Sequence, residues 1–353
     1  MNRSILSLFG AEWFGAVIAT LALAQVYILV YGLEGSTGFR SLAEAIFLLG
    51  VVLFFVLFTL WSLHGLLLKS GRLSHWDNLT RMSFMGLIPI IGFVANYQAI
   101  YFFGLSPVSA ELSLTNFYLE YFLALGIGVV LGYRLYTKEI SSREINYALI
   151  IPPLSIGTGV FLATPLAQYF GPAQGSTIGF LTLTGFGIFF LLYLVIGALA
   201  LSGHVTTKSH ETLPTTMLPV GVASLTILNL FALPYLGAFV HIDFSLSTVY
   251  PLSVMLWGFE LWNFLVVALI IITRPGWGSL GVWAYGFPLG LFATSTLRLS
   301  QYSGLQPLTD MFWVGVAAIT ILWGYAALST GRLLRSRFCS RSEHPNEVPA
   351  HAS

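Results

Sequence analysis

Long apolar stretches separated by short polar loops run through almost the whole chain. Windows of about 20 apolar residues are long enough to cross the hydrocarbon core of a bilayer as helices. The pattern therefore predicts an all-α polytopic membrane protein, with one transmembrane domain over residues 1–335 and a polar, disordered tail over 336–353. The ten predicted helices cover approximately residues 9–32, 42–68, 82–104, 112–135, 146–168, 177–203, 214–235, 247–273, 278–299 and 309–333.

The composition agrees with this pattern. Hydrophobic residues make up 56% of the 353 residues and charged residues only 8%, whereas soluble domains carry about 25% charged residues. The formal net charge of +1 gives no reason to expect nucleic acid or another acidic macromolecule as a partner. The single cysteine, Cys339, lies in the polar tail, so neither a disulfide framework nor a cysteine metal site is expected.

The basic residues predict the orientation of the chain in the membrane, because lysine and arginine are enriched in cytoplasmic loops. If the N-terminus is cytoplasmic, 13 of the 15 basic residues fall on the cytoplasmic side. Only Arg40 and Arg298 then fall outside. We therefore expect a multi-pass protein of the cell (inner or plasma) membrane with both termini in the cytoplasm.

Prolines recur near the middles of four odd-numbered spans. Pro89, Pro152, Pro219 and Pro288 are separated by 63, 67 and 69 residues, close to the length of one helical hairpin. A proline inside a helix costs about 3 kcal/mol, because it removes one backbone hydrogen bond and clashes with the preceding turn. A regular period of this length predicts a repeated unit of two helices, hence five hairpins. The first span has no such proline, but it contains Gly15.

Kinked helices at membrane depth persist only where neighbours or a water-filled cavity satisfy the freed backbone groups. We therefore expect an inner ring of kinked odd-numbered helices around a pore and an outer ring of even-numbered helices. The alternative is that each proline is tolerated independently. Small and hydroxylated residues of the odd helices are expected to line the pore, namely Thr20, Ser83, Ser155, Thr158, Ser224, Thr226, Thr294, Ser295 and Thr296.

Phe287 lies between Gly286 and the helix-bending Pro288. A narrow uncharged lumen can be closed by an apolar side chain, so this position favours Phe287 as a pore gate. The alternative is that Phe287, one of 28 phenylalanines, packs in a core or faces lipid. The four prolines, Gly286 and Thr294 are the expected kink and pore-lining positions. Weaker gate candidates are Phe84, Phe93 and Phe161.

Three carboxylates lie within even-numbered spans: Glu44, Glu120 and Glu260. One interpretation is that they form hydrogen bonds between helices or at a subunit contact. The other is proton coupling, for which Glu120 and Glu260 are the candidates.

Other classes of membrane protein find little support. Haem ligation needs paired histidines within the membrane, and His64 is the only histidine inside a predicted span. His204 and His210 are six residues apart in a predicted loop without a third ligand, so no metal is expected. No enzyme motif or cofactor site stands out. A quinone-binding membrane anchor of an oxidoreductase remains an alternative.

Three stretches carry a resemblance to a known family. AEWFGAVIATLALA at 11–24, PTTMLPVGVASLT at 214–226 and WAYGFPLGLFATSTLRL at 283–299 resemble the first, seventh and ninth helices of the tellurite-resistance/dicarboxylate transporter (TDT) family. That family includes TehA-type channels, plant slow anion channels, yeast malate permeases and fungal sulfite exporters. Where its first helix usually has Gly-Thr-Gly, this chain has Ile18, Ala19, Thr20 and Leu21, so close packing is not expected there.

The resemblance implies ten helices in five hairpins, a homotrimer with one pore in each protomer, and a pore phenylalanine on the ninth helix, which matches Phe287. The function it implies is a passive channel for small anions. The alternative is a proton-coupled carrier of a C4-dicarboxylate such as malate, of sulfite or of tellurite-related anions. The odd spans place charges only at their ends, at Glu12 and Arg298, and this favours the channel. Because no cation is apparent in the lumen, the preference for anions rests on the family alone.

Overall fold

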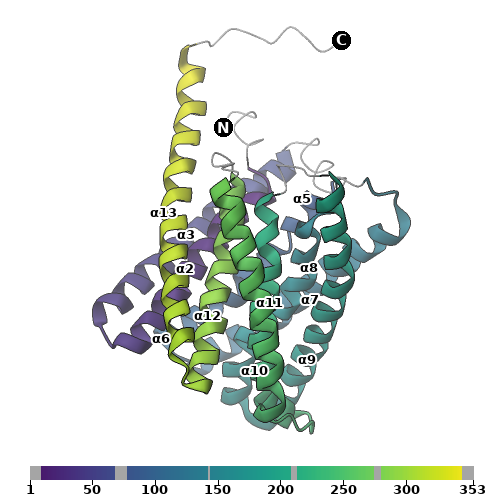
Figure 1. The fold of residues 1–353 in the computed structure, drawn as a ribbon, viewed down its shortest axis with the longest axis vertical. Helices are drawn as coiled ribbons and strands as arrows, with labels where there is room; N and C mark the ends of the chain where they lie inside the picture. Colours follow the sequence, from purple (N-terminus) through teal and green to yellow (C-terminus); the bar gives the residue numbers. More distant parts are fainter. Residues whose placement is uncertain (1–8, 68–77, 142–143, 208–212, 274–279, 344–353) are drawn as a thin grey trace.

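The computed structural model describes residues 9–67, 78–141, 144–207, 213–273 and 280–343 (Figure 1). These residues contain helices and no strands, which confirms the all-α prediction. The α-helices are α2 (Phe14–Glu34), α3 (Thr37–Leu67), α5 (Leu79–Phe84), α6 (Leu87–Phe103), α7 (Pro107–Thr137), α8 (Ile151–Gly157), α9 (Val160–Thr207), α10 (Leu218–Phe239), α11 (Leu246–Thr273), α12 (Gly286–Ser303) and α13 (Gln306–Glu343). The 3₁₀ helices are η1 (Ala11–Trp13), η2 (Tyr147–Ile150), η3 (Leu213–Met217) and η4 (Leu280–Tyr285).

Eight helical segments among the described residues are long and apolar enough to cross a membrane. One of them, Tyr147–Gly203, covers two predicted spans, and Gly171 divides it with a left-handed φ of 67° that only glycine adopts readily. Helix α12 is not among the eight. Helix α12 can contain polar residues because neighbouring helices cover it and keep it out of contact with lipid. All predicted ranges overlap helices, and the count of ten crossings stays a prediction.

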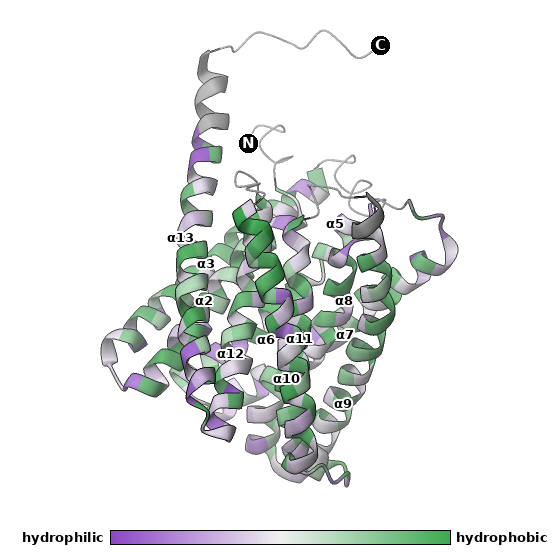
Figure 2. Cartoon of the chain, in the orientation of Figure 1, coloured by the Kyte–Doolittle hydropathy of each residue, from purple (hydrophilic) through white to green (hydrophobic). Residues whose placement is uncertain are grey.

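Burial alternates along the chain. The buried share of the most apolar stretch is 72% for η1 with α2, 56% for α5 with α6 and 83% for η3 with α10. The same share is only 17% for α3, 33% for α7, 11% for α11 and 28% for α13. The poorly buried helices carry exposed apolar side chains, as expected of a surface in contact with lipid (Figure 2).

The buried helices contact one another in a closed circuit. Helix α2 packs against α6, α6 against α8 and α9, α9 against α10, α10 against α12, and α12 returns to α2. The following helix of each hairpin packs on the preceding one, as α3 does on α2, α11 on α10 and α13 on α12. The short segments η1, α5, η2, η3 and η4 form a second circuit at one end of the bundle. We call this end the terminal face, because α2 starts there and α13 extends beyond it (Figure 1).

The four periodic prolines lie in the first turns of helices. Pro152 and Pro219 are the second residues of α8 and α10, and Pro89 and Pro288 are the third residues of α6 and α12. The backbone N–H groups of a first turn have no partner inside the helix, so proline is tolerated there. The expected mid-helix kink is therefore a junction between a short helical segment and a longer α-helix. The first repeat has the same junction, between η1 and α2.

Glycines allow the inner helices to approach closely at these junctions. A Cβ atom on Gly86 would lie 3.1 Å from the backbone of Pro152, and one on Gly221 would lie 3.2 Å from the Pro288 side chain. Both distances are shorter than ordinary van der Waals contact, so any larger residue would separate these helices.

Helices α2 and α12 are also closely packed, although the first helix lacks the glycines of the family pattern. Here α12 contributes the glycines, because a Cβ on Gly286 would collide with Ala19 and one on Gly290 would lie 2.7 Å from the Ala22 Cβ. The expectation of loose packing was therefore wrong, because it considered only one of the two helices.

Helix α13 continues to Glu343, so residues 336–343 are helical although the sequence predicts disorder from residue 336 onward. No proline or glycine interrupts this stretch, and the helix ends before Pro345. Residues 344–353 lie outside the described part of the chain.

Replacing Gly286 with valine should destabilise the bundle by about 1–3 kcal/mol, because the new side chain would overpack the contact with Ala19. The thermal unfolding midpoint of detergent-solubilised protein measures this effect. Gly258→Val on α11 is the matched control, because nothing lies within 4 Å of a Cβ at that position. Equal midpoints for the two variants would contradict the close contact between α2 and α12.

Candidate transport pathway

Three cavities follow one another through the circuit of buried helices. The largest of the three, about 570 Å³ in volume, lies toward the face opposite the terminal face, and we call it the Arg298 vestibule. Side chains from α2, α6, α9, α10 and α12 line it. These residues are Gln25, Leu29, Tyr97, Val160, Phe161, Thr164, Pro165, Gln168, Leu228, Phe231, Ala232, Tyr235, Thr294, Leu297, Arg298 and Gln301.

A second cavity, about 210 Å³ in volume, lies near the terminal face, and we call it the Glu12 vestibule. It is lined by the short segments of the terminal face and by the first turns of the helices that follow them. These residues are Glu12, Gly15, Ile18, Phe84, Leu87, Ile151, Leu154, Thr215, Leu218, Leu280, Gly281, Trp283, Ala284, Phe287 and Pro288.

Between the two vestibules lies a narrow space of about 10 Å³, which we call the constriction. It shares Gln25, Tyr97, Phe161 and Thr294 with the Arg298 vestibule. It shares a single residue, Phe287, with the Glu12 vestibule. The Phe287 side chain is 5% exposed. Phe287 therefore lies between the constriction and the Glu12 vestibule.

The other predicted site residues divide into two groups. Pro288 and Thr294 line the pathway, together with the weaker gate candidates Phe84 and Phe161. Phe93 packs instead against Phe117, with ring centroids 6.0 Å apart. The residues that pack at helix junctions, and do not line these three cavities, are Gly286, Pro89, Pro152 and Pro219.

Four of the nine hydroxylated residues expected to line the pore bond to side chains of the outer helices, namely Thr20, Ser224, Ser295 and Thr296. Four others donate to carbonyl oxygens in the preceding turn, namely Ser83, Ser155, Thr158 and Thr226. The indole Nε1 of Trp323 on α13 donates a hydrogen bond to the Thr20 hydroxyl at 2.9 Å, and Trp257 on α11 donates to Thr296 at 2.9 Å. Of the nine hydroxylated residues named from the sequence, only Thr294 lines the three cavities. The expectation was wrong for the others, because a hydroxyl group can hydrogen-bond to a neighbouring helix as well as to water.

A comparison with known protein families identifies the family of this chain. Residues 8–331 match the voltage-dependent anion channel (SLAC1) family. The chain belongs to that family. The resemblance to the TDT family is confirmed, and the protein is a multi-pass membrane transporter or anion channel.

A relative of this anion channel family member supports the same assignment. An uncharacterized transporter of Methanocaldococcus jannaschii is 24% identical over 359 residues, which covers 94% of this chain and 96% of the relative. The similarity therefore extends over nearly the whole length of both proteins.

The intramembrane carboxylates of this anion channel family member lie away from the three cavities. The carboxylate of Glu260 on α11 is fully buried and accepts hydrogen bonds from Ser224 on α10 and from Ser295 on α12, the latter at 2.9 Å. It thus connects an outer helix to two inner ones. Glu120 on α7 packs against Gly92 of α6, and Glu44 on α3 is partly exposed.

Two charged residues of the pathway were missed by the sequence analysis, which placed them at the ends of spans. Glu12 lines one vestibule and Arg298 lines the other. One vestibule extends from the constriction toward each face of the bundle, so residues near helix ends also line the lumen. Arg298 lies four residues after Thr294, on the same face of α12. That spacing is the signal that could have identified it.

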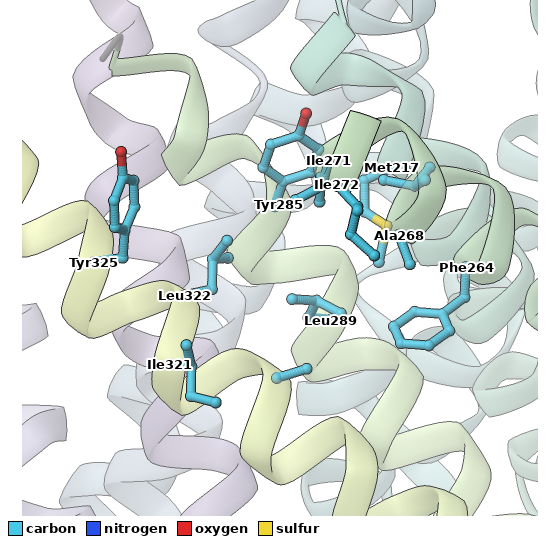
Figure 3. A pocket seen from close by; sticks show the side chains of 12 residues that line it. Met217, Phe264, Ala268, Ile271, Ile272, Tyr285, Leu289, Ile321, Leu322 and Tyr325 are labelled. Atoms are coloured by element: carbon cyan, nitrogen blue, oxygen red, sulfur yellow. The ribbon is translucent and has the colours of Figure 1, made fainter. Parts of the chain in front are cut away.

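A larger cavity, about 750 Å³ in volume, lies outside the circuit, between α11, α12 and α13. Its walls are apolar and include Phe264, Leu289 and Ile321 (Figure 3). Ile321 and Ile272 are 72% and 76% exposed, so the cavity opens on the lipid-facing surface. It is therefore a lateral groove and no part of the pathway.

The described residues contain no group of three or more metal-binding side chains. The Nδ1 atom of His64 lies 3.0 Å from the backbone carbonyl oxygen of Phe9. This contact gives the buried imidazole a hydrogen-bond partner within the protein. His75, His210, His344 and His351 lie outside the described residues.

Cysteines that face the two vestibules should react with a charged, water-soluble thiol reagent in detergent-solubilised protein. In a Cys339→Ser background, Ala284→Cys and Leu228→Cys test the two vestibules, because both positions are partly exposed and line them. Val282→Cys and Ile227→Cys are matched controls on the same elements, because both positions are buried and line none of the three cavities. Mass spectrometry after labelling measures the result, and equal labelling of all four variants would contradict the assignment of the cavities.

Proposed function

We propose that the protein is a passive channel for small anions and that Phe287 is its gate. The observation that carries this proposal is that a narrow constriction separates two vestibules within the circuit of buried helices, and that a single aromatic side chain, Phe287, lines both the constriction and the Glu12 vestibule. The constriction of about 10 Å³ is too small for a hydrated anion to pass. Its apolar wall also disfavours water, as in other hydrophobic gates.

The local structure gives Phe287 a rigid base. Phe287 is the second residue of α12, so its backbone position is set by the junction with η4 and by Pro288 after it. Gly290 lies one turn further along α12 and packs against α2, where it also lines the constriction. Opening then requires movement of the Phe287 side chain about its own bonds, with the surrounding helices in place.

The closed circuit of helix contacts supports an inner ring formed by η1–α2, α5–α6, η2–α8 with the first part of α9, η3–α10 and η4–α12. In this proposal the remaining helices form an outer ring against lipid. The terminal face is cytoplasmic, in agreement with the distribution of lysine and arginine. The cell membrane location and the homotrimer, with one pathway in each protomer, rest on the family resemblance, and no catalytic step is part of the proposal.

The first test of this function is Phe287→Ala, which should raise the anion conductance of the purified protein in planar bilayers by at least about tenfold. A barrier reduction of about 1.4 kcal/mol is sufficient for such a change. Phe259→Ala on the lipid-facing side of α11 is the control, because Phe259 is 41% exposed and lines none of the three cavities. An unchanged current in Phe287→Ala would remove Phe287 as the gate.

A specific observation favours a second candidate, a proton-coupled anion carrier. The Glu12 carboxylate lines the vestibule on the terminal-face side of Phe287, and its buried Oε2 has no hydrogen-bond partner among the described residues. A carboxylate beside an anion pathway repels the anion when ionised and not when protonated. Glu12 is therefore the described carboxylate on which a coupled carrier could depend.

Proton-driven uptake separates the two candidates. In a carrier coupled through Glu12, Glu12→Gln should abolish proton-driven accumulation of the anion in proteoliposomes. In a passive channel, the same variant should raise the anion current, because it removes a carboxylate from the Glu12 vestibule. Glu120→Gln and Glu260→Gln are the controls, because both carboxylates lie outside the three cavities. Loss of proton-driven accumulation in either control, and not in Glu12→Gln, would contradict the role of Glu12.

A further inference from the structure

Arg298 is the only basic residue on the walls of the three cavities formed by the described residues. It belongs to the last turns of α12 and lines the vestibule beyond the Phe287 constriction. No carboxylate lines this vestibule. The acidic residues of the loops and helix ends at this face lie elsewhere, namely Glu34, Glu111, Asp243 and Asp310.

The guanidinium group of Arg298 is held by an aromatic ring and by no anion of the protein. Its central carbon lies 5.4 Å from the centroid of the Phe231 ring, a cation–π contact. The Phe231 ring itself packs on Tyr302, with centroids 5.8 Å apart. Within the described chain Arg298 forms no ion pair or hydrogen bond, so its N–H donors face the cavity without a counter-ion.

A buried side-chain pair places further donors beside Arg298. The Gln98 amide nitrogen donates to the backbone oxygen of Leu21 at 2.8 Å and to Oε1 of Gln25 at 3.4 Å. Gln25 is 7% exposed and lines both the vestibule and the constriction. Because its Oε1 accepts from Gln98, its Nε2 amide is the group left to donate into the cavity.

Tyr97 lies in the same wall as these groups. Tyr97 also lines both the vestibule and the constriction. All three side chains therefore line the Arg298 vestibule, and Gln25 and Tyr97 also line the constriction next to Phe287.

We propose that Arg298, Gln25 and Tyr97 form an anion-binding site that takes a planar oxyanion, such as nitrate or a carboxylate, before it reaches Phe287. This inference rests on the proposed channel function and adds to it a binding site with named residues. The site has hydrogen-bond donors and a positive charge, and no carboxylate that would attract a cation. The planar guanidinium fork matches two oxygens of a planar oxyanion, which a compact ammonium group does not.

The site would give a passage without rings of charge a preference for anions over cations. A guanidinium in a cavity without a carboxylate concentrates anions locally, and it repels cations from the same volume. This effect weakens as salt screens the charge, because the screening length falls to about 3 Å at 1 M salt.

Equilibrium binding tests the site without any need for conduction. Replacing chloride, which is not a planar oxyanion, with nitrate at constant ionic strength should raise the thermal unfolding midpoint of purified wild-type protein. In Arg298→Gln the apparent nitrate affinity should fall at least about tenfold, as expected for the loss of a charged hydrogen-bond donor. Arg298→Lys should recover part of the affinity. Arg40→Gln is the matched control, because Arg40 is an exposed arginine at the same face that lines none of the cavities.

Transport tests the role of the site in selectivity. In an open Phe287→Ala background, Arg298→Gln should lower the anion-to-cation permeability ratio obtained from reversal potentials, and the loss should be larger at 20 mM than at 1 M salt. Unaltered nitrate binding and unaltered selectivity in Arg298→Gln would overturn the site. If nitrate binding depends on Arg298 but the Phe287→Ala variant passes no current, the binding site is supported. In that case only the proposed channel function is contradicted.

Discussion

The central physical constraint on this protein is that each polar group at membrane depth needs a partner. The five inner segments each contain a junction between a short helical segment and a longer helix, and four of them have a proline in the first turn. Such segments could not face lipid, because hydrocarbon offers no partner to the backbone groups at a junction. They are stable because neighbouring helices enclose them. At the break between α8 and α9, for example, the Asn229 side chain of α10 donates to the freed carbonyl oxygen of Gly157 at 3.1 Å.

Enclosure of the junctions has a direct consequence for the pathway. Helices that contact one another in a circuit leave space along its axis, and the side chains at the junctions determine how much of that space remains. On α12 the junction places Phe287 between the constriction and the Glu12 vestibule, while Gly286 and Gly290 let the helix lie directly against α2. The same short stretch therefore supplies the helix contact and the side chain that we propose as the gate. The hydroxyl groups of the inner helices mostly bond to outer-helix side chains or to carbonyl oxygens in the preceding turn. The three cavities are therefore lined by apolar and aromatic side chains, by amides and by one charge in each vestibule.

The sequence was sufficient for the fold class, the positions of the apolar helices and the family. Apolar length and a proline period are properties of single segments, so they are visible without coordinates. The direction of a side chain relative to its neighbours is not. Thr20 and Thr296 were expected in the lumen, but their hydroxyl groups accept hydrogen bonds from Trp323 and Trp257 of the outer helices. Arg298 and Glu12 were placed at the ends of spans and not in the lumen, because the sequence does not show how far each vestibule extends along the helices. Ala19 looked unsuited to close packing, because the glycine that compensates for it lies more than 260 residues away in the sequence, at position 286.

The central claim is that Phe287 divides one continuous pathway into two compartments that open to opposite sides of the membrane. The most direct measurement is the sidedness of cysteine labelling in sealed vesicles of known orientation, with Phe287 intact and an impermeant reagent applied to one side at a time. The account predicts that a cysteine in the Glu12 vestibule reacts only from the cytoplasmic side and a cysteine in the Arg298 vestibule only from the opposite side. Reaction of both cysteines from the same side, or of neither from any side, would contradict it.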